Sequence, residues 1–225
     1  MKRIVISLLA LIILASVSTA ELLVPANPLG KGKIAILGAG AMDQNLNNIS
    51  GMGLTSICGT IGYGLTESLD GYLTIGSSNG TGLPLGLSAY SATQYTGNLK
   101  YTVVNEGVTS PVSVAIGVGV KSVATNSTYV TPFPAVSGSL TQMGGGLIVS
   151  KMMIPFIPYA GLVYRKTTLP GADFSSQIDL TIGSEMAFSK QFLACLEATM
   201  QSISPVGGSN YSGTQIALGA AYILN

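Results

Sequence analysis

Hydrophobic and polar side chains alternate with a period of two along residues 112–121, which read Val-Ser-Val-Ala-Ile-Gly-Val-Gly-Val-Lys. Every even-numbered position in this stretch is β-branched and apolar, and every odd-numbered position is small or polar. Because successive side chains of a strand point to opposite faces, the pattern predicts a strand with one apolar and one polar face. Pro111 precedes the stretch, at a place where its missing N–H removes little from a strand ladder.

Similar alternation recurs along the chain and predicts about ten strands of roughly ten residues each, with eight to twelve as the range. Stretches rich in Gly, Ser, Asn and Pro separate these segments, as turn residues do. The predicted strands cover residues 34–42, 54–65, 69–78, 97–105, 112–121, 140–150, 157–166, 177–186, 192–201 and 214–224.

The connections between these strands are predicted to alternate in length. The long ones cover residues 43–53, 79–96, 122–138, 168–176 and 203–212, and the short ones cover 66–68, 106–110, 151–156 and 188–190. Short turns at one end and long loops at the other, with an even strand number, are typical of outer-membrane barrels.

Composition favours the same architecture. Only 8% of the residues are charged and the mean hydropathy is +0.52, whereas a soluble domain is about one quarter charged. After residue 20 no apolar run approaches the length of about 20 residues that a membrane-spanning helix needs. Because only helices and closed barrels satisfy every backbone group in lipid, the sequence predicts an all-β fold, a closed antiparallel up-and-down transmembrane β-barrel.

The N-terminal segment is predicted to direct export. Lys2 and Arg3 form a basic region, residues 4–14 an apolar core, and residues 18–20 (Ser-Thr-Ala) a cleavage site. We therefore expect a signal peptide at 1–20, an extended lead-in with two prolines at 21–30 and a barrel at 31–225. Without residues 1–20 the remaining chain is nearly neutral, so charge gives no reason to expect a nucleic-acid partner.

Two local patterns resemble those of small bacterial outer-membrane β-barrels of the porin-like and OmpA-like superfamily. One is Tyr-Gly-Leu-Thr-Glu-Ser-Leu at 63–69, across a tight turn, and the other is Pro-Tyr-Ala-Gly-Leu-Val-Tyr at 158–164, entering a strand. The resemblance covers residues 31–225 and implies a location in the cell outer membrane. It also implies outer-membrane lipid and the barrel-assembly machinery as partners.

If the apolar faces contact lipid, the charged side chains of the strands point into the lumen. The inward assignment has the lower free energy, because an outward Lys or Arg near the midplane costs about 2–4 kcal/mol. The candidates that line the lumen are Lys100, Lys121, Arg165, Asp179, Glu185 and Glu197. Two interpretations are open, an interior filled by ion pairs that stabilise the barrel or a ring that selects a solute.

Other chemistry has little support in the sequence. The chain contains no His, which argues against a Ser-His-Asp triad and against a typical zinc site, and no catalytic residue, metal or cofactor is expected. Gly38 and Gly40 begin a dinucleotide-binding pattern, but Asp43 stands at its third glycine position. Cys58 and Cys195 both fall on the predicted lumen face, where either a disulfide or two separate thiols would fit.

The function predicted from these features is a non-enzymatic outer-membrane barrel with a structural role or a narrow pore for small solutes. The alternative is a surface adhesin that binds a ligand through the loops 43–53, 79–96 and 122–138. A secreted soluble β-protein is a third reading, but it would have polar outer faces. Conductance in planar bilayers would favour the pore, and partner binding that is lost on loop deletion would favour the adhesin. The sequence does not fix an oligomeric state.

Overall fold

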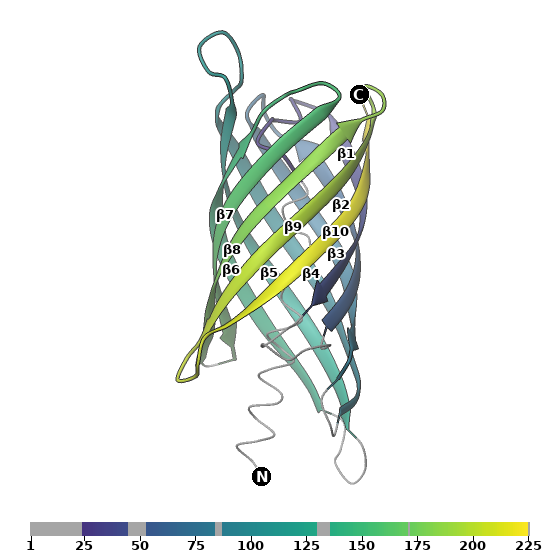
Figure 1. Ribbon diagram of the computed structural model, residues 1–225, viewed down its shortest axis with the longest axis vertical. Coiled ribbons are helices and arrows are strands. Elements are labelled where there is room, and N and C mark those ends of the chain that lie inside the picture. The colour runs from purple at the N-terminus through teal and green to yellow at the C-terminus, as the bar shows by residue number, and fades with distance from the viewer. Residues whose placement is uncertain (1–23, 45–52, 84–86, 130–135, 171, 225) are drawn as a thin grey trace.

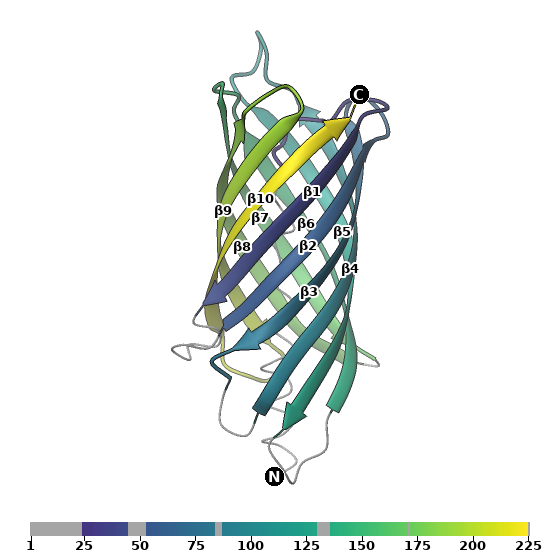
Figure 2. The ribbon, with the colours of Figure 1, turned by 90° about the vertical axis from the view of Figure 1, so that its right-hand side faces the viewer.

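Ten antiparallel strands form one sheet that closes into a barrel in the computed structural model, which describes residues 24–44, 53–83, 87–129, 136–170 and 172–224. Each strand pairs with its neighbour in sequence, and β1 closes the barrel against β10. Figures 1 and 2 show the strands slanting around an elongated barrel. The strands are β1 (Ile34–Gln44), β2 (Gly53–Gly64), β3 (Leu69–Thr81), β4 (Leu87–Val104), β5 (Ser113–Tyr129), β6 (Val136–Ser150), β7 (Phe156–Leu169), β8 (Ala172–Ala187), β9 (Phe192–Pro205) and β10 (Tyr211–Leu224).

This architecture confirms the predicted closed barrel and its strand number. The pairing of Ile34 with Leu224 and of Met42 with Ile216 closes the ring. Ile34 and Leu224 lie at the same end of the barrel as the β2–β3, β4–β5, β6–β7 and β8–β9 connections, and we call this end the turn end. We call the opposite end the loop end. No helix of the described residues is long and apolar enough to cross a membrane. The predicted signal peptide, residues 1–20, lies outside the described residues.

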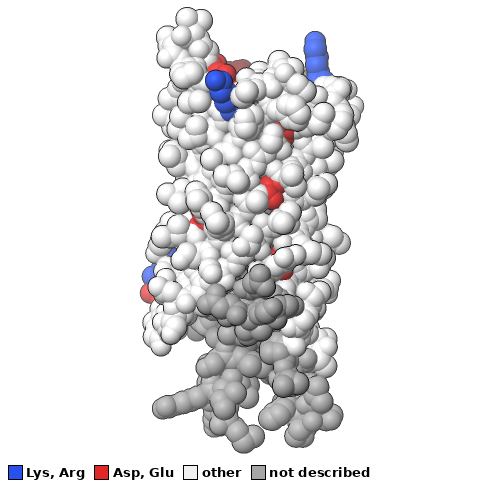
Figure 3. Space-filling view, viewed as in Figure 1, with Lys and Arg blue, Asp and Glu red and all other residues white. Residues whose placement is uncertain are grey.

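The alternating pattern separates an apolar outer surface from a polar interior. On β5, Ile116, Val118 and Val120 point outward and are 47–60% exposed, whereas Lys121 points inward and is 2% exposed. Large apolar side chains are exposed in the same way on the other strands, and Figure 3 shows Lys and Arg only toward the two ends of one face. Such an outer surface is unfavourable in water and suits the hydrocarbon region of a bilayer.

The strands of one side continue past this apolar band toward the loop end, which corrects the predicted long loops. Residues 79–96 were expected to form a loop, but β3 runs to Thr81 and β4 begins at Leu87. Residues 122–138 were also expected to form a loop, but β5 runs to Tyr129 and β6 begins at Val136. The Ser- and Thr-rich sequence was misleading because these segments pair with one another, which satisfies their backbone groups without apolar side chains.

We call the outward-facing side of these extensions the overhang. Its members carry no charge, and most have a hydroxyl or amide group. They are Ser77, Asn79, Thr81, Ala89, Ser91, Thr93, Ser122, Ala124, Asn126, Thr128, Ser137, Ser139 and Thr141.

Candidate functional site

The chain enters β1 through a reversal at residues 30–33 that directs the preceding residues back into the barrel. Gly30 and Gly32 have φ values of 89° and 80°, which favour glycine. The Gly32 N–H donates to the carbonyl oxygen of Gly64 at 2.9 Å. A Cβ on Gly64 would collide with the Gly30 carbonyl oxygen, so the last residue of β2 must be small for this approach.

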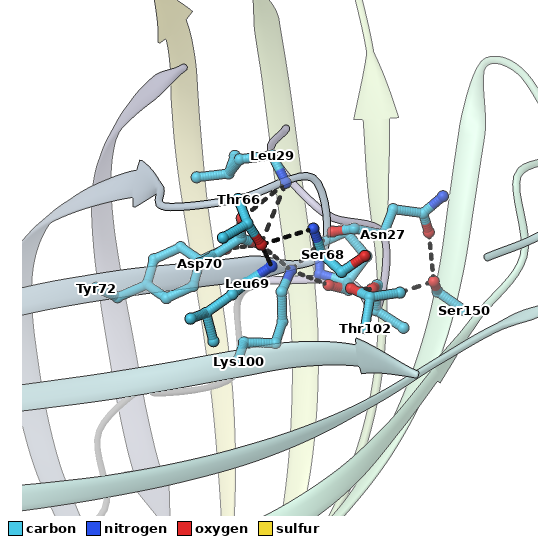
Figure 4. Close-up of polar contacts among 12 residues, drawn as sticks. Asn27, Leu29, Thr66, Ser68, Leu69, Asp70, Tyr72, Lys100, Thr102 and Ser150 are labelled. Atoms are coloured by element: carbon cyan, nitrogen blue, oxygen red, sulfur yellow. Dashed lines mark hydrogen bonds and ion pairs between the residues drawn. The ribbon is translucent and has the colours of Figure 1, made fainter. Parts of the chain in front are cut away.

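Residues 24–29, which we call the lead-in from here on, therefore lie across the lumen near the turn end (Figure 4). The Lys100 ammonium donates to the carbonyl oxygens of Pro25, at 2.8 Å, and Asn27, at 2.7 Å. The Thr102 hydroxyl donates to the carbonyl oxygen of Ala26 at 2.8 Å. Both side chains come from β4, so this strand binds three consecutive carbonyl groups of the lead-in.

Other strands hold the N–H groups of the lead-in. The Ala26 N–H donates to Ser150 Oγ of β6 at 3.1 Å, and Ser150 in turn donates to Asn27 Oδ1 at 2.6 Å. The Leu29 N–H lies 3.2 Å from each carboxylate oxygen of Asp70 on β3. The Ala26 side chain is fully buried and packs in a small apolar cluster with Ala115 and Ile148.

An ion pair between β3 and β4 lies at the centre of this arrangement. Asp70 Oδ2 is 3.2 Å from Lys100 Nζ, and the two side chains are 0% and 5% exposed. The Tyr72 hydroxyl also donates to Asp70 Oδ2, at 3.2 Å. Because a buried charge is stable only when it is paired and hydrogen-bonded, the lead-in and this ion pair depend on each other.

All six residues that are predicted to line the lumen are buried in the structure. They are Lys100 (4% exposed), Lys121 (2%), Arg165 (6%), Asp179 (1%), Glu185 (5%) and Glu197 (2%). Arg165 Nη1 lies 2.5 Å from Asp179 Oδ2, and Gln177 Nε2 donates to Asp179 Oδ1 at 2.6 Å. Strands β7 and β8 therefore share a second buried ion pair.

The remaining carboxylates lie on β8 and β9. Glu197 accepts hydrogen bonds from the Tyr159 hydroxyl at 2.9 Å and from the Thr199 hydroxyl at 3.3 Å. Glu185 pairs in register with Cys195. Glu185 lies within electrostatic reach of Lys100, and Glu197 lies within reach of Arg165 and Asp179.

Sequence reasoning missed two inward carboxylates. Asp43 is 1% exposed and accepts from Gln215 Nε2 at 3.1 Å, but it was assigned to a loop because β1 was predicted to end at Met42. Asp70 is 0% exposed and was left out of the candidate set. Its alternation with Leu69 and Leu73 on the predicted strand 69–78 was a signal that could have identified it.

Inward-facing glycines create the space that the large interior side chains occupy. A Cβ on Gly183 would collide with the Tyr159 ring, and one on Gly62 would lie 2.7 Å from the Tyr72 ring. A Cβ on Gly144 would lie 2.9 Å from Cγ of Arg165. Side chains of one strand thus lie over glycines of the next strand inside the barrel.

A cavity of about 90 Å³ is left between these side chains and the lead-in. Val24 of the lead-in contributes to its wall, and its polar lining includes three cations. The polar lining residues are Thr60, Tyr72, Thr74, Thr96, Asn98, Lys100, Lys121, Gln142 and Arg165. This volume is enough for several water molecules.

Neither cysteine is in a disulfide, which decides between the two open arrangements in favour of separate thiols. Cys195 is buried and Cys58 is partly buried. Cys58 of β2 pairs with Ala39 of β1, which pairs with Gly219 of β10, which in turn pairs with Cys195 of β9. Three strand spacings therefore separate the backbones of the two cysteines. In the part of the chain that the structure describes, no group of three His, Cys, Asp or Glu side chains could hold a metal ion.

Comparison with known proteins agrees with this geometry at the level of the fold. No protein-family model matches the sequence, and no curated protein matches it as a relative. An outer-membrane channel from Pseudomonas putida F1 superposes with a TM-score of 0.51 at 14% identity, over 92% of this chain and all of that chain. The β-domain of the Bordetella autotransporter BrkA superposes with a TM-score of 0.50 at 9% identity, over 85% of this chain and 98% of that one. The chain has the fold of the bacterial outer-membrane β-barrels.

The two superposed barrels, a channel and an autotransporter domain, share this fold although their names describe different roles. The outer-membrane protease OmpT from Escherichia coli is also similar, with a TM-score of 0.46 at 10% identity, over 85% of this chain and 95% of that chain. The shared fold therefore supports an outer-membrane barrel in general, and any finer assignment depends on the interior of this chain.

Proposed function

We propose that this protein is a non-enzymatic outer-membrane barrel that forms a narrow pore for small solutes, held closed by its own lead-in. The observation that carries the proposal is the binding of residues 24–29 across the turn end by Asp70, Lys100, Thr102 and Ser150. An interior with polar groups and a residual cavity suits solutes once the lead-in leaves. Turns and barrel termini share the periplasmic side in such barrels, so the lead-in would close the pore from that side.

The interior chemistry supports the non-enzymatic part of the proposal. The chain has no His, and Asp179 is committed to an ion pair with Arg165. Glu197 already accepts two hydrogen bonds from neighbouring side chains. These contacts hold the interior side chains of neighbouring strands together, which gives Asp179 and Glu197 a structural role in the barrel.

Enlarging Ala26 tests the proposed gate. We expect Ala26→Leu to displace the lead-in, because its side chain is fully buried against Ala115 and Ile148. Overpacking of this kind costs about 1–3 kcal/mol, which corresponds to a rise of about 5- to 150-fold in the ratio of open to closed states. Single-channel recording in planar bilayers should show long closed periods for the unmodified protein and frequent openings for the variant.

The matched control is Ala124→Leu, which makes the same change at an exposed position of β5 and should leave conductance unchanged. Equal conductance for the unmodified protein and both variants would contradict the gate.

An adhesin is a second candidate. The sequence suggested that it would bind through long loops, but the feature that favours it in the structure is the overhang. The overhang presents uncharged hydroxyl and amide groups beyond the apolar band. Loss of ligand binding after replacing Thr93, Asn126 and Ser139 with Ala, with unchanged conductance, would favour surface binding over the pore.

A further inference from the structure

We infer that the turn end of the lumen is a binding site for short, uncharged peptides in an extended conformation, and that the lead-in occupies it in cis. The inference rests on the proposed pore, because it names the class of solute that the site would take after the lead-in leaves. The site consists of Asp70, Lys100, Thr102 and Ser150, together with a small apolar pocket of Ala115 and Ile148.

The first argument is that the barrel recognises the main chain of the lead-in. Lys100 and Thr102 bind three successive carbonyl oxygens, at Pro25, Ala26 and Asn27. The bound N–H groups belong to Ala26 and Leu29. Asn27 Oδ1 supplies the side-chain contact in this set. Every peptide has these carbonyl and N–H groups, so a site built on them tolerates many sequences.

The second argument is that the charges of the site match the polarity of a peptide. The ammonium of Lys100 contacts the negative ends of carbonyl dipoles, and the carboxylate of Asp70 contacts the positive end of an N–H dipole. The two groups also neutralise each other at 3.2 Å. An uncharged backbone satisfies both without adding a net charge to a buried site, whereas a charged side chain would leave one ion uncompensated. The site therefore favours uncharged peptides in one chain direction.

The third argument concerns size. The pocket around Ala26 leaves its side chain 0% exposed, and Ala115 of β5 is also 0% exposed. A methyl group fills this space, and a larger side chain would overlap the pocket walls. The peptide should therefore carry Ala or Gly at the position that corresponds to Ala26.

A free peptide must compete with a segment that is covalently attached. Tethering gives the lead-in an effective concentration in the millimolar range, so a peptide in solution gains the site only when the lead-in is displaced. Ala26→Leu provides this condition, because it changes the lead-in and leaves the four polar residues of the site intact.

The experiment measures the unfolding temperature of the full mature chain in detergent with a blocked peptide of sequence Val-Pro-Ala-Asn-Pro-Leu, which is that of residues 24–29. We expect saturating peptide to raise the midpoint of the Ala26→Leu variant by about 4–8 °C, since a ligand that binds the folded state stabilises it. The unmodified protein, whose site is filled, should show no rise. A second peptide with Leu in place of Ala should give no rise with either protein.

A variant without residues 24–29 serves as a second acceptor, in case the enlarged side chain of the first variant keeps part of the site covered. Failure of the native peptide to raise the midpoint of either variant, or equal rises with both peptides, would overturn the inference. A peptide-dependent rise in a protein that never conducts supports the site and rejects only the pore. Conductance in Ala26→Leu without any such rise supports the pore and rejects the peptide site.

Discussion

Lys100→Met should lower the free energy of unfolding by about 3–5 kcal/mol, because it leaves Asp70 as a buried carboxylate without its counter-charge. The same change removes the donor for the carbonyl oxygens of Pro25 and Asn27, so the lead-in should also leave the lumen. Urea unfolding of the barrel in lipid vesicles measures the first effect, and bilayer conductance measures the second.

The double variant Asp70→Asn with Lys100→Met separates charge from packing. With both charges removed, most of the lost stability should return, since the penalty of the single variant comes from the uncompensated ion. The conductance of the double variant should stay high, because the ammonium that holds the lead-in is absent from it. A double variant that is less stable than Lys100→Met would contradict the assigned role of the ion pair.

Val118→Lys should destabilise the barrel by about 2–4 kcal/mol in a bilayer, because Val118 is 60% exposed in the middle of the apolar outer surface of β5. Asn126→Lys is the matched control on the same face of the same strand. It lies on the overhang, beyond the apolar band, and should cost about 0–1 kcal/mol. The unfolding free energies of both variants in lipid vesicles show how the cost of an outward lysine depends on its depth in the bilayer.

Equal costs for the two lysines would mean that the apolar surface of β5 does not face lipid. A larger cost at Asn126 than at Val118 would reverse the assigned membrane position of the strand.

The sequence was sufficient for the features that depend on local alternation. The faces of β5 follow from the β-branched residues of 112–121. The buried positions of Lys121 and Asp179 follow from the same alternation, because side chains two residues apart in a strand share a face. Strand ends were harder to predict from residue types. The extension of β4 back to Leu87 depends on pairing with β3 and β5, which supply hydrogen bonds to a segment whose composition is typical of a loop.

The lead-in could be recognised as an extended segment but not located. Its contacts join residues that are far apart in sequence, such as Ala26 with Ser150 and Pro25 with Lys100. No periodicity encodes contacts of this kind, since they depend on barrel closure and on the reversal at Gly30 and Gly32. The inward position of Asp70 could be found from the alternation along β3, but its contact with the Leu29 N–H could not, because Leu29 is not on a neighbouring strand.

The position of the lead-in in the lumen is the central claim, and a disulfide cross-link tests it most directly. Asn27→Cys and Ser150→Cys, in a chain with Cys58 and Cys195 replaced by Ser, place thiols at two side chains whose oxygens lie 2.6 Å apart. We predict that mild oxidation cross-links the folded barrel nearly completely. The pair Asn27→Cys and Ser139→Cys, which places the second thiol on the outer face of β6, should not cross-link within one chain. A folded barrel in which the thiol introduced at position 27 forms no bond to the one at position 150, and reacts freely with a bulky maleimide, would contradict the claim.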